Sequence, residues 1–324
     1  MSRRPGTSSA STRGASSRSA EGDGRPARVT APHGVTRPAL GAVLVVTAAC
    51  LWGSLGLFGR LAFQRGVTPV ELASIRAALA FVFALPLLAF RPRALRVQRR
   101  DLPLFLAYGA VSVGLFYWIY LAAVDRLPLA IAAALLYTAP GFVVAIAWAM
   151  RWEPVRLHRL LPLAMVLAGA VLVTGAWRAL GTASIDAVGA ALGLGSGLAY
   201  ALYTAIGKRI RARYDALTTI LWAYGIGAAV LAIAAPPWSV MVEHPEARLL
   251  ILLMALGPTF LAALAFFIGL RHIDASAASM LATIEPVVAA LLGLLWLGEA
   301  LTVEAVAGIG LIVGAAVWLA RRAS

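Results

Sequence analysis

One carboxylate, Glu285, lies within an otherwise uncharged segment, residues 275–298, directly before Pro286. All other side chains of the segment are apolar or small. Removal from water disfavours the ionised form of a carboxylate, so that such a group can take up and release a proton or bind a cation. Its position indicates proton binding or recognition of an ammonium group. The alternative is a structural acid that only hydrogen-bonds a neighbouring helix.

A second charge, Arg76, lies within the apolar segment 69–90. It is about seven residues from the start, a depth of roughly 10 Å at the helical rise of about 1.5 Å per residue. Its guanidinium has the chemistry to bind a carboxylate or a phosphate, or to pair with Glu285. A long arginine side chain at this depth can equally extend to lipid headgroups.

Several aromatic residues with a polar atom lie in the middle of apolar segments, and six of them form the predicted site: Trp52, Tyr137, Tyr200, Tyr203, Trp222 and Tyr224. Tyr200 and Tyr203 are three positions apart and share one helix face, as do Tyr117 and Tyr120. Packing explains any single one of them. As a group, they indicate a pocket that stacks on or hydrogen-bonds a small, partly apolar solute.

Two prolines, Pro140 and Pro286, lie 146 positions apart in similar surroundings. Proline has no N–H, so the carbonyls of Leu136 and Ala282 lose their helical donors. Either proline can be a simple packing kink. Matched interruptions in corresponding helices of two repeats are also the sequence pattern that marks a binding site at the membrane midplane.

The elements that carry these residues are long and apolar. The chain has 324 residues, of which 61% are hydrophobic and 13% are charged, and its mean hydropathy is +0.86. A soluble protein of this size needs far more polar surface. Ten segments are long enough to cross a hydrocarbon core as helices; they are 38–59, 69–90, 102–124, 127–150, 160–177, 187–207, 216–242, 249–270, 275–298 and 305–320. The sequence therefore predicts an all-α polytopic membrane protein with ten transmembrane helices.

Basic residues are distributed unequally between the connecting segments. Ten helices place both termini on one side, and that side holds 22 Lys and Arg against 5 on the other. Because cytoplasmic loops carry such an excess, both termini are predicted to be cytoplasmic, with the chain in an inner or plasma membrane. The net charge of +14 is then a consequence of topology, and no nucleic-acid partner is expected.

Residues 1–37 differ from the remainder, because they are rich in Ser, Arg, Gly and Pro and nearly free of large apolar side chains. Such a segment cannot bury enough surface to fold, so a disordered, basic cytoplasmic tail is predicted. An organellar transit peptide is the alternative, although the Pro and Gly content opposes the amphipathic helix that it requires.

The spans divide into two groups of five, residues 38–178 and 187–320. The offset of 146 that relates the two prolines also carries Glu153 onto Glu299. Because each group has an odd number of helices, the second must cross the membrane in the opposite direction to the first, as in alternating-access carriers. Glu153 and Glu299 are each expected to complement the N-terminus of the helix that follows.

Four stretches resemble EamA-type transporters of the drug/metabolite transporter superfamily: LWGS (51–54), YTAP (137–140), GLRHIDASAAS (269–279) and EPVVAALLGLLWLGEALT (285–302). The resemblance covers nearly all of residues 40–320. It implies a ten-helix inner-membrane carrier of small metabolites, amino acids among them. The first half departs from the family pattern, because RWEP (151–154) stands where Gly-Glu is usual.

The predicted function is secondary-active transport, as an exporter of small metabolites such as amino acids or amines, by alternating access and with proton coupling through Glu285. The sequence has no phosphate-binding loop motif, so a gradient or exchange is expected to drive transport. The expected partners are the substrate, protons and the lipid bilayer, and the oligomeric state stays open.

An intramembrane enzyme is one alternative, but it needs clustered His, Asp or Glu within the bilayer. The four histidines instead fall in the tail or in loops: His33, His158, His244 and His272. No metal, cofactor or catalytic residue is therefore predicted. An ion channel would need rings of charge or carbonyl filters, which the sequence does not indicate. A non-transporting membrane scaffold stays an open alternative.

Overall fold

The computed structural model describes residues 37–154, 157–180 and 186–323. The predicted tail lies outside these residues except for Arg37. In the described part of the chain every regular element is helical, which confirms the predicted all-α class. The α-helices are α1 (Pro38–Gly53), α2 (Leu55–Phe63), α3 (Pro69–Ala84), α4 (Leu102–Gly109), α5 (Phe116–Arg126), α6 (Leu129–Leu136), α7 (Ala139–Ala149), α8 (Leu160–Thr174), α9 (Ala176–Leu180), α10 (Ala187–Arg211), α11 (Ala216–Leu231), α12 (Pro237–Glu243), α13 (Arg248–Met254), α14 (Ala262–Leu270), α15 (Ala275–Ala282), α16 (Glu285–Leu297) and α17 (Val303–Ala323).

Nine helical segments among the described residues are long and apolar enough to cross a membrane, with lengths of 18 to 28 residues. Several consist of consecutive helices, as where α1 and α2 together form Pro38–Phe63. Two contain a π-helical turn, Ala110–Leu115 between α4 and α5 and Ala255–Leu261 between α13 and α14. The predicted span 216–242 begins with α11, which is apolar but has only 16 residues.

Two of the long segments break at equivalent places. Helices α6 and α15 each have 8 residues and start 146 positions apart. Each is followed by a residue outside helical geometry, Tyr137 at φ −73° and ψ 6° and Thr283 at φ −68° and ψ 4°. Helices α7 and α16 begin two residues later, with Pro140 and Pro286 in their first turns. Proline is tolerated there because the first N–H groups of a helix have no intrahelical partner.

Side-chain caps fix the starts of two long helices. At the start of α3, Thr68 and Glu71 form a capping box in which Glu71 Oε2 accepts the N–H of Thr68 at 2.7 Å. At the start of α10, Asp186 accepts the N–H of Gly189 at 3.0 Å. This bond and the neighbouring Arg126 hold the pKa of the Asp186 carboxyl below its ordinary value. The caps satisfy backbone donors that an apolar helix leaves unpaired.

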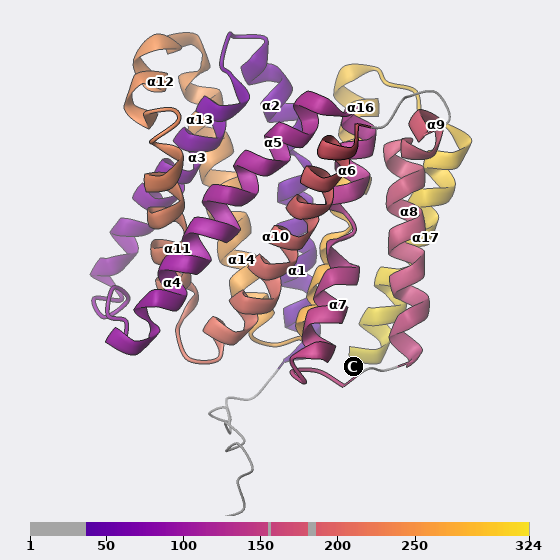
Figure 1. The fold of residues 1–324 in the computed structure, drawn as a ribbon, viewed down its shortest axis with the longest axis horizontal. Coiled ribbons are helices and arrows are strands. Elements are labelled where there is room, and N and C mark those ends of the chain that lie inside the picture. Colours follow the sequence, from indigo (N-terminus) through magenta and orange to yellow (C-terminus); the bar gives the residue numbers. More distant parts are fainter. Residues whose placement is uncertain (1–36, 155–156, 181–185, 324) are drawn as a thin grey trace, which may run out of the picture. The chain divides into compact units, whose positions relative to one another are not determined.

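The two predicted halves interleave. Helix α1 packs on α14, and α10 packs on α5, so the first helix of each half contacts a helix of the other. Helix α3 also packs on α11, and α8 packs on α17 (Figure 1). A Cβ atom on Gly269 would lie 2.7 Å from the carbonyl oxygen of Gly41. Glycine at both positions therefore permits the close approach of α1 and α14.

The small-residue stripe of α10, Gly189, Gly193 and Gly197, packs against helices of the same chain. A Cβ atom on Gly197 would lie 2.7 Å from Thr138 Oγ1 and 2.8 Å from the carbonyl oxygen of Leu135. Helix α10 consequently lies directly against the break between α6 and α7.

The basic loops lie together. Segments 91–101, 151–159, 208–215 and 271–274, in their described residues, are at the lower end of the helices in Figure 1, which we call the basic end. Contacts join them: Tyr214 Oη donates to Asp101 at 2.6 Å, and the N–H of Ala275 donates to Glu153 at 2.6 Å. The other ends of the helices, with α9, α12 and the end of α16, form the opposite end.

Candidate functional site

Glu285 is the first residue of α16, and its side chain is half-buried against residues from other helices. Tyr137, which follows α6, lies next to the carboxylate. Arg76, Tyr120 and Tyr200 lie within electrostatic range of it. An acid at a helix N-terminus is also favoured by the helix dipole. The break before α16 therefore presents this carboxylate to protein groups of α3, α5 and α10 and to Tyr137, which follows α6.

Arg76 of α3 stacks on Tyr117 of α5, with the guanidinium carbon 4.2 Å from the ring centroid. Its Nε is buried and has no hydrogen-bond partner. Tyr224 of α11 lies beside both residues. An unpaired buried donor on a cation is costly unless a ligand or water satisfies it, so Arg76 has capacity to bind an anionic group.

Aromatic rings connect these two charged residues. The ring centroid of Tyr200 lies 6.2 Å from Trp52, 6.2 Å from Tyr203 and 5.7 Å from Phe116. Tyr203 in turn stacks on Phe266 at 5.6 Å, and its hydroxyl is buried without a hydrogen-bond partner. These rings combine apolar surface with one unpaired hydroxyl, a chemistry that suits a small, partly apolar ligand.

Seven of the eight predicted site residues lie in one connected group. We call it the central cluster; its predicted members are Trp52, Arg76, Tyr137, Tyr200, Tyr203, Tyr224 and Glu285. The structure adds Phe116, Tyr117, Tyr120 and Phe266 to it. The sequence contained a signal for two of these, because Tyr117 and Tyr120 share a helix face.

The eighth residue, Trp222, lies elsewhere. Its ring is 6.0 Å from Phe105, which contacts Tyr214 at 5.0 Å near the basic end. Side chains two positions apart on a helix point about 200° apart, so Trp222 cannot share the direction of Tyr224. Its buried Nε1 has no hydrogen-bond partner.

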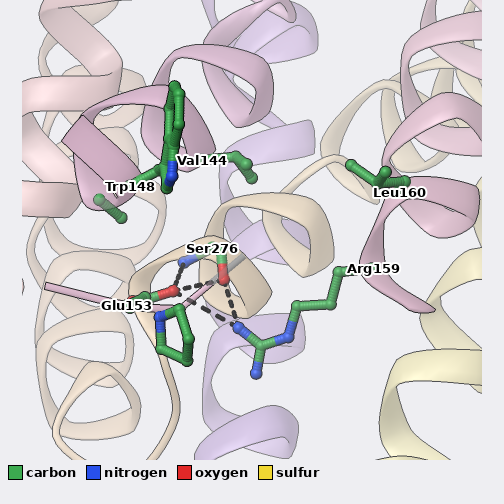
Figure 2. Close-up of a pocket in the computed structure, with 8 residues that line it drawn as sticks. Val144, Trp148, Glu153, Arg159, Leu160 and Ser276 are labelled. Atoms are coloured by element: carbon green, nitrogen blue, oxygen red, sulfur yellow. Dashed lines mark hydrogen bonds and ion pairs between the residues drawn. The ribbon is translucent and has the colours of Figure 1, made fainter. Parts of the chain in front are cut away.

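A second polar group lies at the basic end, around Glu153 (Figure 2). Glu153 accepts the N–H of Ala275 at 2.6 Å and the hydroxyl of Ser276 at 2.5 Å. Arg159 contacts Glu153 at 3.4 Å, donates to Ser276 Oγ at 2.6 Å and pairs with Asp274. The expectation that Glu153 complements the following helix is wrong: it caps α15, from the other half of the chain.

Glu299 lies at the opposite end and forms an ion pair with Arg60 at 2.6 Å. Its own N–H donates to the carbonyl of Gly293 at 3.1 Å. The Glu299 side chain is 52% exposed and that of Arg60 is 47% exposed, whereas Glu153 and Arg159 are 12% and 15% exposed. The two related acids are thus in different environments.

One group of side chains has metal-ligand types. Ligand atoms of Glu71, Glu243 and His244 lie within 4.8 Å of one another. Glu71 Oε2 already accepts from the Thr68 N–H at 2.7 Å and the Thr68 hydroxyl at 2.8 Å, and His244 Nε2 is 3.6 Å from it. Capping of α3 therefore accounts for the position of Glu71, and His244 lies beside it.

The helices and the central cluster define the class of the protein. Long apolar helices that enclose an acid, a cation and aromatic rings are typical of polytopic membrane transporters. The chain belongs to the EamA-like transporter family, whose model matches residues 39–175 and 187–321. It is a multi-pass membrane protein, and its family is one of transporters rather than enzymes.

Curated relatives agree with this family. An uncharacterized transporter of Archaeoglobus fulgidus is 28% identical over 273 residues, covering 84% of this chain and 93% of the relative. The threonine/homoserine exporter RhtA of Escherichia coli K12 is 28% identical over 277 residues, covering 84% and 88%. A solved crystal structure matches the fold with a TM-score of 0.74 at 21% identity, covering 88% of this chain and 99% of the other.

Proposed function

We propose that this protein is a secondary-active exporter of small metabolites, such as amino acids or amines, and that Glu285 couples transport to protons. The observation that carries the proposal is the position of Glu285, which starts α16 and lies near Tyr137, Arg76 and Tyr200 of other elements. A carboxylate that loses and regains a proton changes its attraction for an ammonium group, and this links proton movement to substrate release.

The central cluster supports a zwitterionic or cationic substrate. Glu285 offers a negative partner for an ammonium group, and the unpaired Nε of Arg76 offers a donor to a carboxylate. The rings of Trp52 and Tyr200 supply apolar contact. The name of the relative RhtA, a threonine/homoserine exporter, favours amino acids and export.

For the architecture we propose ten transmembrane helices, with α11 as the short one, in two inverted repeats of five. Residues 38–178 and 187–320 form the repeats, and a separate basic tail, 1–37, precedes them. The equal offset of the α6–α7 and α15–α16 breaks supports this arrangement. Both termini are proposed to be cytoplasmic because of the Lys and Arg excess.

The test is flux through purified protein in liposomes with an imposed pH gradient. Glu285→Gln keeps the shape of the side chain but cannot ionise, so proton-driven flux is expected to fall to the level of empty liposomes. Glu246→Gln, which changes an exposed acid, is the matched control and should transport like the wild type. Unchanged flux in Glu285→Gln would remove this residue from the mechanism.

Substrate identity is tested by thermal shift against a metabolite panel. A small zwitterion or cation is expected to stabilise the wild type but not Glu285→Ala. Equal stabilisation of both would place the binding site elsewhere. Saturable flux of the stabilising compound separates a carrier from a scaffold, and product formation in detergent would instead identify an enzyme.

A further inference from the structure

Glu153 and Glu299 hold equivalent places in the two halves, and each connects the halves at a different end. Glu153 follows α7, at the basic end, and caps α15 of the second half. Glu299 follows α16, at the opposite end, and pairs with Arg60 of the first half. The counterpart of α15 at the offset of 146 is α6, whose first residue is Leu129.

The two acids differ in how deeply they and their partners are buried. At the basic end Glu153 and Arg159 are nearly buried and pair with each other. Glu153 accepts the N–H of Ala275, and Arg159 donates to Ser276 Oγ. At the opposite end both members of the Arg60–Glu299 pair are about half exposed. An exposed ion pair contributes little to stability, whereas a buried, hydrogen-bonded one resists opening.

Helix packing has the same asymmetry. Helix α15 packs against α7 at the basic end, with Glu153 bonded to its first turn. Within the described residues the counterparts α6 and α16 make no comparable contact. The N-terminus of α6 also has no side-chain cap, because its N-cap residue is Pro128. The first N–H groups of α6 therefore lack the carboxylate that those of α15 have.

We propose that Glu153 and Glu299 are alternating caps that decide which end of the protein is closed. In the structure described, Glu153 caps α15 and closes the basic end. When that end opens, Glu299 reaches the N–H groups of Leu129 and Ala130 at the start of α6 and closes the opposite end. This inference rests on the alternating-access function proposed above.

Two proline substitutions test the caps directly. Ala275→Pro removes the N–H that bonds Glu153, at a first helical position that accepts proline and after a residue, Asp274, that is already extended at φ −65° and ψ 152°. Leu129→Pro is the matched change at the start of α6, after Pro128 at φ −49° and ψ 134°. Glu153→Gln weakens the first cap without a backbone change.

The measurement is the distribution of distances between spin labels in bilayer nanodiscs, on a Cys50→Ser background. One label pair, at Met150 and Arg271, reports the basic end, and another, at Phe63 and Ala300, reports the opposite end; all four residues are exposed. Ala275→Pro and Glu153→Gln should each lower the ratio of molecules with a closed basic end to molecules with an open one about tenfold. This is the effect of losing one hydrogen bond to a charged group. Leu129→Pro should shift it toward closed.

The inference is overturned if Ala275→Pro and Glu153→Gln leave both distributions unchanged in monodisperse protein, or if Leu129→Pro shifts them in the same direction as Ala275→Pro. The distances need neither substrate nor a proton gradient, so they are independent of the flux assay. If Ala275→Pro and Leu129→Pro shift the distances in opposite directions but the wild type shows no flux, the cap proposal stands and the transport proposal fails. Flux without shifts would keep transport and remove the caps.

Discussion

The guanidinium carbon of Arg76 lies over the ring of Tyr117, 4.2 Å from its centroid, while the buried Nε of Arg76 has no hydrogen-bond partner. The ring holds the cation in place without neutralising it. This leaves the charge of Arg76 available to a ligand in the central cluster.

Tyr117 is therefore expected to position Arg76 for a carboxylate of the substrate. Tyr117→Leu should weaken binding of carboxylate-bearing substrates roughly thirtyfold, because a desolvated cation–π contact contributes about 2 kcal/mol. Tyr117→Phe keeps a ring and should bind within about twofold of the wild type. Calorimetric titration of the stabilising metabolite measures both. Equal weakening by the two variants would instead assign the role to the hydroxyl group.

Trp222 should be dispensable for transport, because it contacts Phe105 rather than the central cluster. Trp222→Phe removes a buried N–H that has no partner, so the denaturation midpoint should stay equal or rise, by the equivalent of about 1 kcal/mol. Trp52→Phe changes a ring that contacts Tyr200 and Tyr203, and it should alter substrate affinity. Loss of flux in Trp222→Phe with normal flux in Trp52→Phe would contradict this assignment.

Gly197 should be intolerant of a side chain, since an added Cβ would lie 2.7 Å from Thr138 Oγ1 and 2.8 Å from a backbone oxygen. Gly197→Ala is expected to destabilise the protein by about 1–3 kcal/mol, as overpacking does. Gly141→Ala is the control, because an added Cβ meets nothing within 4 Å there, and it should be neutral or stabilise by about 0.5–1 kcal/mol. Thermal denaturation in detergent measures both, and similar midpoints for the two variants would show that α10 is not held against the break.

Tyr214 should make stability depend on alkaline pH. Burial and the hydrogen bond to Asp101 raise the pKa of its hydroxyl above the ordinary value. A group whose pKa is raised on folding stabilises the protein below the unfolded-state pKa, and this contribution disappears as the pH rises through the folded-state pKa. Tyr214→Phe should thus be less stable than the wild type near about pH 8, and the difference should narrow by about pH 11.

The same variant keeps the ring contact with Phe105, so the comparison isolates the hydroxyl group. Denaturation midpoints at several pH values measure the effect. A constant difference across the range would mean that the Tyr214 hydroxyl does not contribute through its ionisation.

Much of the fold is readable from local sequence. The length of the apolar segments predicted the membrane-length helices. The two prolines predicted where α7 and α16 begin, because a proline lacks the N–H that its own helix needs for a hydrogen bond. The family was also accessible, since the stretch at 285–302 carries its residues in order, and the family model matches both halves. The short α11 was predicted as part of a longer span, because sequence hydropathy does not reveal where a helix stops before Pro236.

The chemical groups that the membrane-length helices carry, an acid, a cation and polar aromatics, could be read from each segment alone, because burial cost and helix geometry are properties of the segment. Which of these groups contact one another follows from the packing of the helices. Trp222 and Tyr224 are similar residues in the same apolar segment, but Trp222 contacts Phe105 and Tyr224 lies near Arg76. Glu153 caps a helix that begins 122 positions later in the chain rather than the helix that follows it. Such contacts depend on how helices that are distant in the sequence pack on each other. The close approach of Gly41 and Gly269 is an example, because it requires that neither position carries a side chain.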